Sequence, residues 1–394
     1  MSEPHELATL AVHGGERHPK AHDAITDAIY CTSTYTFRDS AAVLRFLEED
    51  PNREEYGRYG NPNERTVERK LAALEGAESA LVFSSGMSAI VTLLMAKIDA
   101  GDEIIFFDEC YHRSREFCLK HLSRFGVTTR VVKTNDYTAL EAAVGPKTKM
   151  LVSESPTNPH LSVVDVDRFA AFGRRVGVET LIDATLATPF NLRPIAAGID
   201  YVLHSATKYL GGHNDLLAGV VAGSTEKLEP VRNLRGIIGT IASPHVCWLL
   251  QRGLKTFALR MAQHNRNGLA LAEFLASRPE VKRVYYPGLS SHPCSEVARR
   301  TMTGFGGLLT FTLTGDRHDA MRFVDAVRIP KIGPSLGGVE SLIEQPLLMS
   351  YWKMTPEQRA AVGIEDAMIR VAAGIEDTDE LVADFRQAFG ALNR

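Results

Sequence analysis

The sequence has few cysteines, no long apolar run and no excess of charge of either sign. Its 5 cysteines among 394 residues are odd in number and show no C-x-x-C spacing, which argues against a disulfide framework or a cysteine zinc site and indicates a reducing compartment. The most apolar stretch, residues 80–98, is interrupted by Ser84-Ser85-Gly86 and is not predicted to span a membrane. The first twenty residues are polar, so no signal peptide is predicted. These features predict a cytoplasmic protein.

The charge balance also narrows the class of partner. The chain carries 48 acids and 44 bases, a formal net charge of −4, which gives no support for a nucleic acid or a membrane surface as partner. Apolar residues make up 44% and charged residues 23%, so a disordered or fibrous chain is excluded. At about 150 residues per domain, the length suggests two or three domains.

The spacing of apolar residues divides the chain into three parts. Residues 1–60 show few long periodic runs and predict an N-terminal arm. Residues 61–250 alternate short apolar runs with helical segments, which predicts an α/β fold whose mostly parallel sheet has helices on both faces. Residues 251–394 predict a smaller α+β domain. The strands predicted are 80–83, 103–107, 129–132, 150–152, 180–182, 201–203, 218–222, 281–286, 308–313 and 369–372.

Helices are predicted between most of these strands. The first covers residues 63–74, with Asn63 as its N-cap and apolar side chains at helical spacing. The other helices are predicted at 87–97, 113–124, 167–175, 257–276, 319–326 and 378–392.

Two polar residues follow the ends of predicted strands. Asp183 ends the strand at 180–182, and Lys208 lies shortly after the strand at 201–203. Ligands of open α/β sheets bind at strand ends, so both side chains could face one pocket. A buried lysine there is a candidate for covalent chemistry, since burial lowers an amine pKa from about 10.4 toward neutrality. The alternative is a surface lysine in an ordinary ion pair.

A second element lies between a strand and a helix. The turn Ser84-Ser85-Gly86-Met87 could hold a phosphate on its backbone N–H groups. It lacks both the lysine of a P-loop and the spacing of a dinucleotide loop, so a plain turn is the alternative. His13, His18 and His22 show no regular spacing, and no metal site is predicted.

Several separated motifs together resemble one family. Ser205-Ala206-Thr207-Lys208-Tyr209 resembles the lysine signature of the Cys/Met-metabolism family of enzymes that use pyridoxal 5′-phosphate (PLP). The other matching segments are 56–62, 154–159, 334–338, 370 and 374–377, so the resemblance covers nearly the whole chain. It implies the PLP-dependent transferase fold of type I, with PLP as cofactor. It also implies an amino-acid substrate and a homo-oligomer, usually a tetramer built from dimers.

The resemblance implies a role for each matching cofactor residue. Lys208 would form a Schiff base with PLP and move protons between substrate carbons. Asp183 would pair with the ring nitrogen, and Tyr111 would stack on the ring and act as an acid or base near the leaving group. The phosphate would be held by Gly86, Met87, Ser205 and Thr207, and by Tyr56 and Arg58 of a neighbouring subunit.

The same resemblance implies the residues that hold the substrate. Arg370 would form a bidentate pair with the α-carboxylate, assisted by Asn158 and Ser335. Glu340 lies where the family discriminates the distal end of the substrate. Structural roles for Ser335 and Glu340 are the alternative.

Departures from the common pattern bear on the reaction. Bulky, cationic His112 and Arg113 follow Tyr111, where many lyases have two small residues. Ala184 replaces the asparagine usual after Asp183, which removes an amide beside the cofactor. Segments such as Met349-Ser350-Tyr351-Trp352 look most like plant-type cystathionine γ-synthases.

The resemblance implies chemistry at the γ-carbon of a sulfur amino acid or an O-acyl-homoserine. The reaction is γ-replacement, as in cystathionine γ-synthase, or γ-elimination, as in methionine and cystathionine γ-lyases. A few kcal/mol between competing barriers decides the ratio, at about 1.4 kcal/mol per tenfold. An aminotransferase or decarboxylase on the same fold, and a non-catalytic binding module, are the alternatives.

Overall fold

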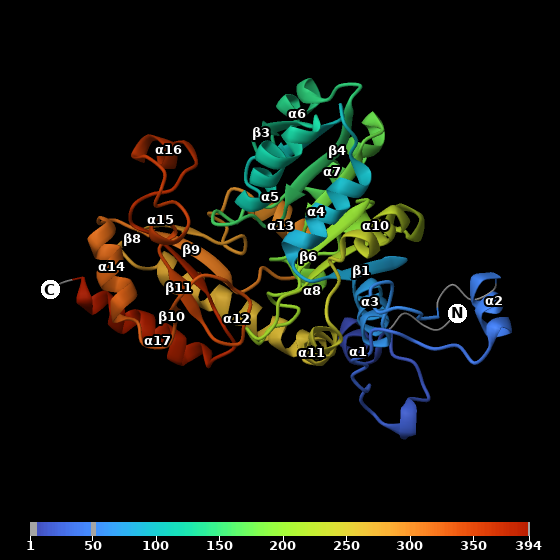
Figure 1. Ribbon diagram of the computed structural model, residues 1–394. Helices are drawn as coiled ribbons and strands as arrows, with labels where there is room; N and C mark the ends of the chain where they lie inside the picture. Colours follow the sequence, from blue (N-terminus) through green and yellow to red (C-terminus); the bar gives the residue numbers. More distant parts are fainter. Residues whose placement is uncertain (1–5, 49–52, 393–394) are drawn as a thin grey trace.

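The apolar runs of the middle of the chain form a seven-stranded sheet in the computed structural model, which describes residues 6–48 and 53–392 (Figure 1). β7 runs antiparallel to both of its neighbours, β1 and β6, and the other pairs are parallel. The predicted mostly parallel sheet is therefore confirmed, with β7 as the reversed strand. Its strands lie in the order β1 (Ser79–Phe83), β7 (Gly219–Gly223), β6 (Tyr201–Ser205), β5 (Glu179–Asp183), β4 (Thr148–Glu154), β2 (Glu103–Phe107) and β3 (Thr128–Val132).

Helices cover both faces of this sheet because its strands are apolar on both sides. On one face lie α4 (Gly86–Lys97) and α10 (Thr225–Ile238), which bury side chains such as Leu81, Phe106 and Leu203. The other face is covered in two parts. α6 (Tyr137–Ala143) and α7 (Val166–Val176) pack on the parallel strands. α3 (Pro62–Glu75) packs on β1 and β7, and α11 (Pro244–Lys255) packs on α3.

The start of α3 differs from the prediction. Its N-cap is Asn61, whose side chain accepts a hydrogen bond from the backbone N–H of Asn63 at 2.9 Å. Pro62 occupies the first helical position, where its missing N–H costs nothing. The assignment of Asn63 as the cap was wrong, because the helix already begins at the proline.

The helix predicted at 113–124 is broken into three pieces. α5 (His112–Glu116) is followed by a π-helical turn over Phe117–His121 and a 3₁₀ turn over Leu122–Phe125. A π turn inserts one residue, so side chains beyond it change face. The 3.6-residue apolar spacing of the sequence could not reveal this insertion.

The C-terminal part forms a second sheet in a separate lobe (Figure 1). Its strand order is β10 (Lys331–Ile332), β11 (Leu342–Glu344), β12 (Met368–Ala372), β9 (Leu308–Leu313) and β8 (Val281–Tyr285). Three amphipathic helices bury their apolar faces on it, namely α12 (Phe257–Ala276), α14 (Arg317–Ala326) and α17 (Thr378–Ala388). The remaining helices of this part and of the linking segments are α8 (Thr188–Asn191), α9 (Pro194–Ala197), α13 (Ser295–Thr301), α15 (Pro346–Met349) and α16 (Pro356–Ala361).

The N-terminal segment contains two helices that the sequence reading did not identify, α1 (Leu7–His13) and α2 (Ser40–Glu48). α1 packs against α3, where the buried amine of Lys70 donates to the carbonyls of Ala11 at 3.0 Å and Val12 at 2.8 Å. α2 extends away from both lobes (Figure 1). None of the helices in the described ranges is long and apolar enough to cross a membrane.

Candidate active site

Lys208 lies in the turn that follows β6 and reaches toward the second lobe. Its Nζ donates a hydrogen bond to Ser335 Oγ at 2.6 Å, a residue 127 positions later in the chain. Burial lowers the pKa of Lys208 to about 8, and the positive charge of Arg370 acts in the same direction. The predicted strand-end lysine is therefore a partly buried amine near a second cation.

Arg370 on β12 lies on the other side of Ser335. Its Nη2 donates to the Ser335 carbonyl at 2.9 Å, and its Nη1 lies 3.4 Å from Asn158 Oδ1 and 3.1 Å from Glu344 Oε1. The side chain is buried, and its Nε has no hydrogen-bond partner among the described residues. A buried guanidinium with an open donor is suited to bind a carboxylate.

Asp183 ends β5 and is held by a single neighbour. Its Oδ1 accepts from Thr185 twice, from the backbone N–H at 3.0 Å and from the hydroxyl at 2.6 Å. Thr185 Oγ1 in turn accepts from the backbone N–H of Ser205 at 2.8 Å. Burial raises the pKa of Asp183, while the two bonds from Thr185 oppose that rise. This chain of hydrogen bonds ties the end of β5 to the turn that carries Lys208.

The turn between β1 and α4 packs closely on the same region. Ser85 is the N-cap of α4, and its side chain and that of Ser88 form a capping box. The backbone N–H groups at positions 86 and 87 therefore lie in the first turn of α4, where N–H groups have no partner within the helix. A Cβ on Gly86 would lie 2.9 Å from the Cβ of Ser205, so only glycine allows this approach. Thr207, by contrast, uses its hydroxyl on the backbone of Ala218, accepting at 3.1 Å and donating at 3.3 Å.

Tyr111 follows β2 and precedes α5. Its ring is 45% exposed and lies edge-on to His112, with 5.0 Å between the ring centroids. Its backbone N–H donates to Glu154 Oε2 at 2.7 Å. The ring is thus presented from the edge of the sheet while its backbone is fixed by a buried carboxyl group.

Glu340 is held near Lys208 by the loop that follows the lysine. Asn214 Nδ2 donates to Glu340 Oε2 at 2.7 Å, and Val339 N–H donates to the Gly212 carbonyl at 3.0 Å. Ser335 has a φ of +87°, a backbone conformation that non-glycine residues rarely adopt. This conformation turns its hydroxyl to Lys208 and its carbonyl to Arg370.

Tyr56 and Arg58 are not brought into this group. The Arg58 guanidinium donates to the carbonyl of Gly236 at the end of α10 and to Tyr59 Oη. Among the residues that the structure describes, no hydrogen bond or ion pair joins Tyr56 or Arg58 to Lys208, Asp183 or Arg370. Their role at the phosphate of a neighbouring subunit stays a prediction.

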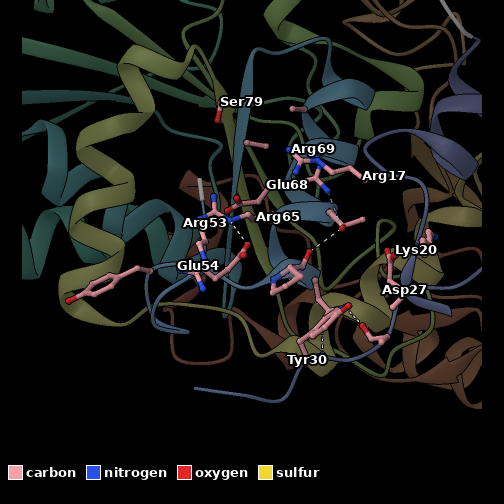
Figure 2. Close-up of a pocket in the computed structure, with 18 of the residues that line it drawn as sticks. Arg17, Lys20, Asp27, Tyr30, Arg53, Glu54, Arg65, Glu68, Arg69 and Ser79 are labelled. Carbon is pink, nitrogen blue, oxygen red and sulfur yellow. Dashed lines mark hydrogen bonds and ion pairs between the residues drawn. The ribbon is translucent and has the colours of Figure 1, made fainter. Parts of the chain in front are cut away.

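A large cavity lies elsewhere in the molecule. Its volume is about 1210 Å³, and it opens between the N-terminal arm, α3 and the start of α10 (Figure 2). Arg17, Arg65 and Arg69 line it, and Arg65 forms a 2.8 Å ion pair with Glu54. None of the residues predicted for the active site lines this cavity, so size alone does not indicate where the chemistry occurs.

Three residues of the site were missed in the sequence reading. Thr185 could have been found, because a hydroxyl two residues after an aspartate commonly bonds back to it. Glu344 pairs with Arg370 through strand register, and Glu154 reaches Tyr111 from a neighbouring strand. Neither pairing has a signal in local sequence.

Comparisons with known proteins identify the family and the fold. Residues 8–390 match the family described as Cys/Met metabolism PLP-dependent enzyme. The chain is 44% identical over 387 residues to chloroplastic cystathionine gamma-synthase 1 of Arabidopsis thaliana, covering 98% of this chain and 69% of that protein. It is 38% identical over 387 residues to L-methionine gamma-lyase of Pseudomonas putida, covering 98% and 97%. The crystal structure of metB from Corynebacterium glutamicum superposes with a TM-score of 0.92 at 34% identity, covering 98% of each chain.

Proposed function

The chain belongs to the Cys/Met-metabolism family of PLP-dependent enzymes, has the type I fold of that class, and on that premise we propose that it catalyses γ-replacement on an O-acyl-L-homoserine. In this reaction a thiol such as L-cysteine forms a bond to the γ-carbon, and the acyl group leaves as a carboxylate. With cysteine the product is cystathionine. γ-Elimination from a sulfur amino acid is the competing reaction on the same site.

The residues at the strand ends fit PLP. Their donor set combines an amine of lowered pKa, a buried carboxyl group and the open N–H groups at the start of α4. Gly86 leaves the space beside Ser205 that a side chain would fill. Amine, acid and helix N-terminus match the aldehyde, ring nitrogen and phosphate of the cofactor.

PLP, when bound, supplies an electron-withdrawing ring that stabilises negative charge on carbons near the substrate amino group. Lys208 would hold the cofactor covalently and afterwards take and return protons through its Nζ. Asp183, oriented by Thr185, would keep a proton on the ring nitrogen. Gly86, Met87, Ser205 and Thr207 would hold the phosphate, with Thr207 exchanging its present bond to Ala218.

The buried guanidinium of Arg370 would bind the substrate α-carboxylate. Asn158 and the Ser335 carbonyl fix its plane, and Glu344 balances part of its charge. Ser335 Oγ would orient Lys208 between proton transfers. Glu340, held by Asn214, would face the distal end of the substrate.

Tyr111 would stack on the cofactor ring and assist departure of the group at the γ-carbon.

Tyr56 and Arg58 would reach the phosphate of a neighbouring subunit, which requires at least a dimer and favours the tetramer expected from the sequence. The cytoplasmic location expected from the sequence stays a prediction.

The observation that carries the proposal is the contact of Lys208 with Ser335 and, through Ser335, with Arg370. An amine of lowered pKa and a buried guanidinium thus share one neighbour, which supports a role of the first in proton transfer and of the second in binding a carboxylate. The choice of γ-replacement is supported by the 44% identity to a cystathionine gamma-synthase and by the cationic Arg113 shortly after Tyr111, which suits a leaving group that departs as an anion.

A product assay on the PLP-loaded protein tests this choice. One tube contains an O-acyl-L-homoserine, such as O-acetyl- or O-succinyl-L-homoserine, with L-cysteine, and the other contains L-methionine or L-cystathionine alone. Cystathionine in the first tube with little 2-oxobutyrate in the second is the expected result. 2-Oxobutyrate and ammonia from the second tube would instead assign a γ-lyase, and transamination products would assign an aminotransferase.

A further inference from the structure

Two carboxyl groups lie side by side at the end of the large sheet. β4 ends at Glu154 and β5 ends at Asp183, and the two residues are direct register partners on adjacent parallel strands. Neighbouring strands are about 4.8 Å apart, and register partners on parallel strands point to the same face. The two side chains therefore lie next to each other at the ends of their strands. Glu154 is 6% exposed and has no role in the proposed reaction.

No cation within the described ranges forms an ion pair with either acid. The groups that face Glu154 are Asp183 on β5, Glu109 and Cys110 after β2, and Tyr351 after α15. Arg115 on α5 faces Cys110 and Tyr351 and donates to the carbonyl of Asp108, and His204 on β6 faces Asp183. Two buried carboxylates this close cannot both be ionised without a counter-ion.

The hydrogen bonds decide which acid keeps the proton. Asp183 accepts two bonds from Thr185, and both stabilise its negative charge. Glu154 accepts one bond, from Tyr111 N–H, and has Glu109 as a second acidic neighbour. The proton is therefore better placed on Glu154.

We propose that Glu154 is a positioning residue that carries the proton of this buried pair, so that Asp183 is the ionised member of the two. Its Oε2 at the same time fixes the backbone of Tyr111. Burial, and then the charge of Asp183, raise the pKa of Glu154 well above its usual range, in agreement with this assignment. The inference rests on the proposed function, because it assigns Asp183 to the ring nitrogen of the cofactor.

The test measures the folding equilibrium of the cofactor-free protein against pH, with Glu154→Gln as the main variant. A carboxyl group that is protonated when folded and ionised when unfolded stabilises the protein at low pH, and this stabilisation is lost as the pH rises. The folding constant of the wild type relative to E154Q should therefore fall as the pH rises above the ordinary glutamate pKa of about 4.3, by up to about tenfold per pH unit, until the pH reaches the pKa of folded Glu154. Glu103→Gln is the matched control, since Glu103 is a buried acid on β2 but is paired with Arg130 at 2.5 Å. E103Q should keep the wild-type slope.

A wild-type slope in E154Q would overturn the proposal. If E154Q does not fold, Glu154→Met provides a second neutral side chain of similar length with the same expected slope. Failure of both neutral variants to fold at any pH would show that the folded protein needs the carboxylate, and would also overturn it.

A second readout separates this inference from the proposed function. PLP-loaded E154Q should keep the wild-type visible spectrum between pH 6 and 8, because the amide accepts the Tyr111 N–H as the neutral acid does. Absence of any PLP absorbance in the wild type would refute the proposed function and leave the unfolding result interpretable by itself. A lost spectrum in E154Q alone would overturn the neutral state assigned to Glu154.

Discussion

Lys70, which is buried, and Lys208, which is partly buried, have similarly lowered pKa values and different surroundings. Burial lowers the pKa of each to about 8. Lys70 donates to the carbonyls of Ala11 and Val12 and lies 3.7 Å from the carboxylate of Glu16. Lys208 donates only to the Ser335 hydroxyl and faces the guanidinium of Arg370.

The difference shows why a lowered pKa does not by itself identify a reactive lysine. The Lys70 amine makes two hydrogen bonds and one ion pair with oxygen atoms of the N-terminal arm, so it holds the arm on α3. The Lys208 amine makes one hydrogen bond to a side chain, so it can still donate further hydrogen bonds or, when neutral, use its lone pair at the edge of the sheet. The number of fixed partners, rather than the pKa, separates a structural lysine from a chemical one.

Of the substitutions that test this comparison, Lys208→Ala should have the largest effect. Turnover of the PLP-loaded protein should fall by about a thousandfold or more, because the only amine able to move the substrate protons is removed. The unfolding free energy of the cofactor-free protein should change by less than about 1 kcal/mol, since one hydrogen bond is lost. Steady-state kinetics and urea unfolding provide the two readouts. Turnover near the wild-type rate would contradict the assignment.

Lys70→Met should have the opposite effect. Removing the amine leaves two buried carbonyls unpaired, so the unfolding free energy should fall by about 3 kcal/mol. The measurement is urea unfolding of the cofactor-free protein. The kcat of the fraction that remains folded should be unchanged, and a large loss of kcat would erase the distinction between the two lysines.

Arg370→Lys tests the substrate side of the Lys208 group. A lysine keeps the charge but loses the planar fork, so kcat/KM should fall by about tenfold or more, largely through a higher KM. Initial rates over a range of substrate concentration separate KM from kcat. An unchanged KM would remove Arg370 from the carboxylate site.

The pH dependence of labelling gives the smallest effect. With a pKa of about 8, the neutral fraction of Lys208 rises about fivefold from pH 7 to 8 and levels off above pH 9. Labelling of the cofactor-free protein with an amine reagent, followed by peptide mass spectrometry, measures this curve. Exposed Lys147 serves as the reference site, and Lys70 should stay unlabelled because it is buried. A Lys208 curve that keeps rising tenfold per pH unit would contradict the lowered pKa.

Local sequence was sufficient for much of the fold. The strand at 103–107 and the helix at 257–276 were predicted with the observed bounds, because their apolar spacing is regular and uninterrupted. Prediction from local sequence failed where the backbone departs from regular α-helical geometry, as at the π turn after α5. It also misplaced the cap of α3 by two residues, since two asparagines compete around Pro62.

The site divides in the same way. Asp183 and Lys208 could be predicted from their places after strands, and the resemblance to a known family supplied Ser335 and Arg370. The positive φ of Ser335 and the pairing of Glu154 with Asp183 arise only from tertiary structure. Partners more than a hundred positions apart leave no periodic signal in one sequence.

The bonds from Lys208 to Ser335 and from Arg370 to Asn158 each join one lobe to the other. A small relative movement of the lobes would break both bonds while leaving each sheet intact. Such partial openings need less free energy than global unfolding. In rising urea, catalysis should therefore disappear before the far-UV circular dichroism changes, and the gap between the two curves would measure how firmly the lobes adhere.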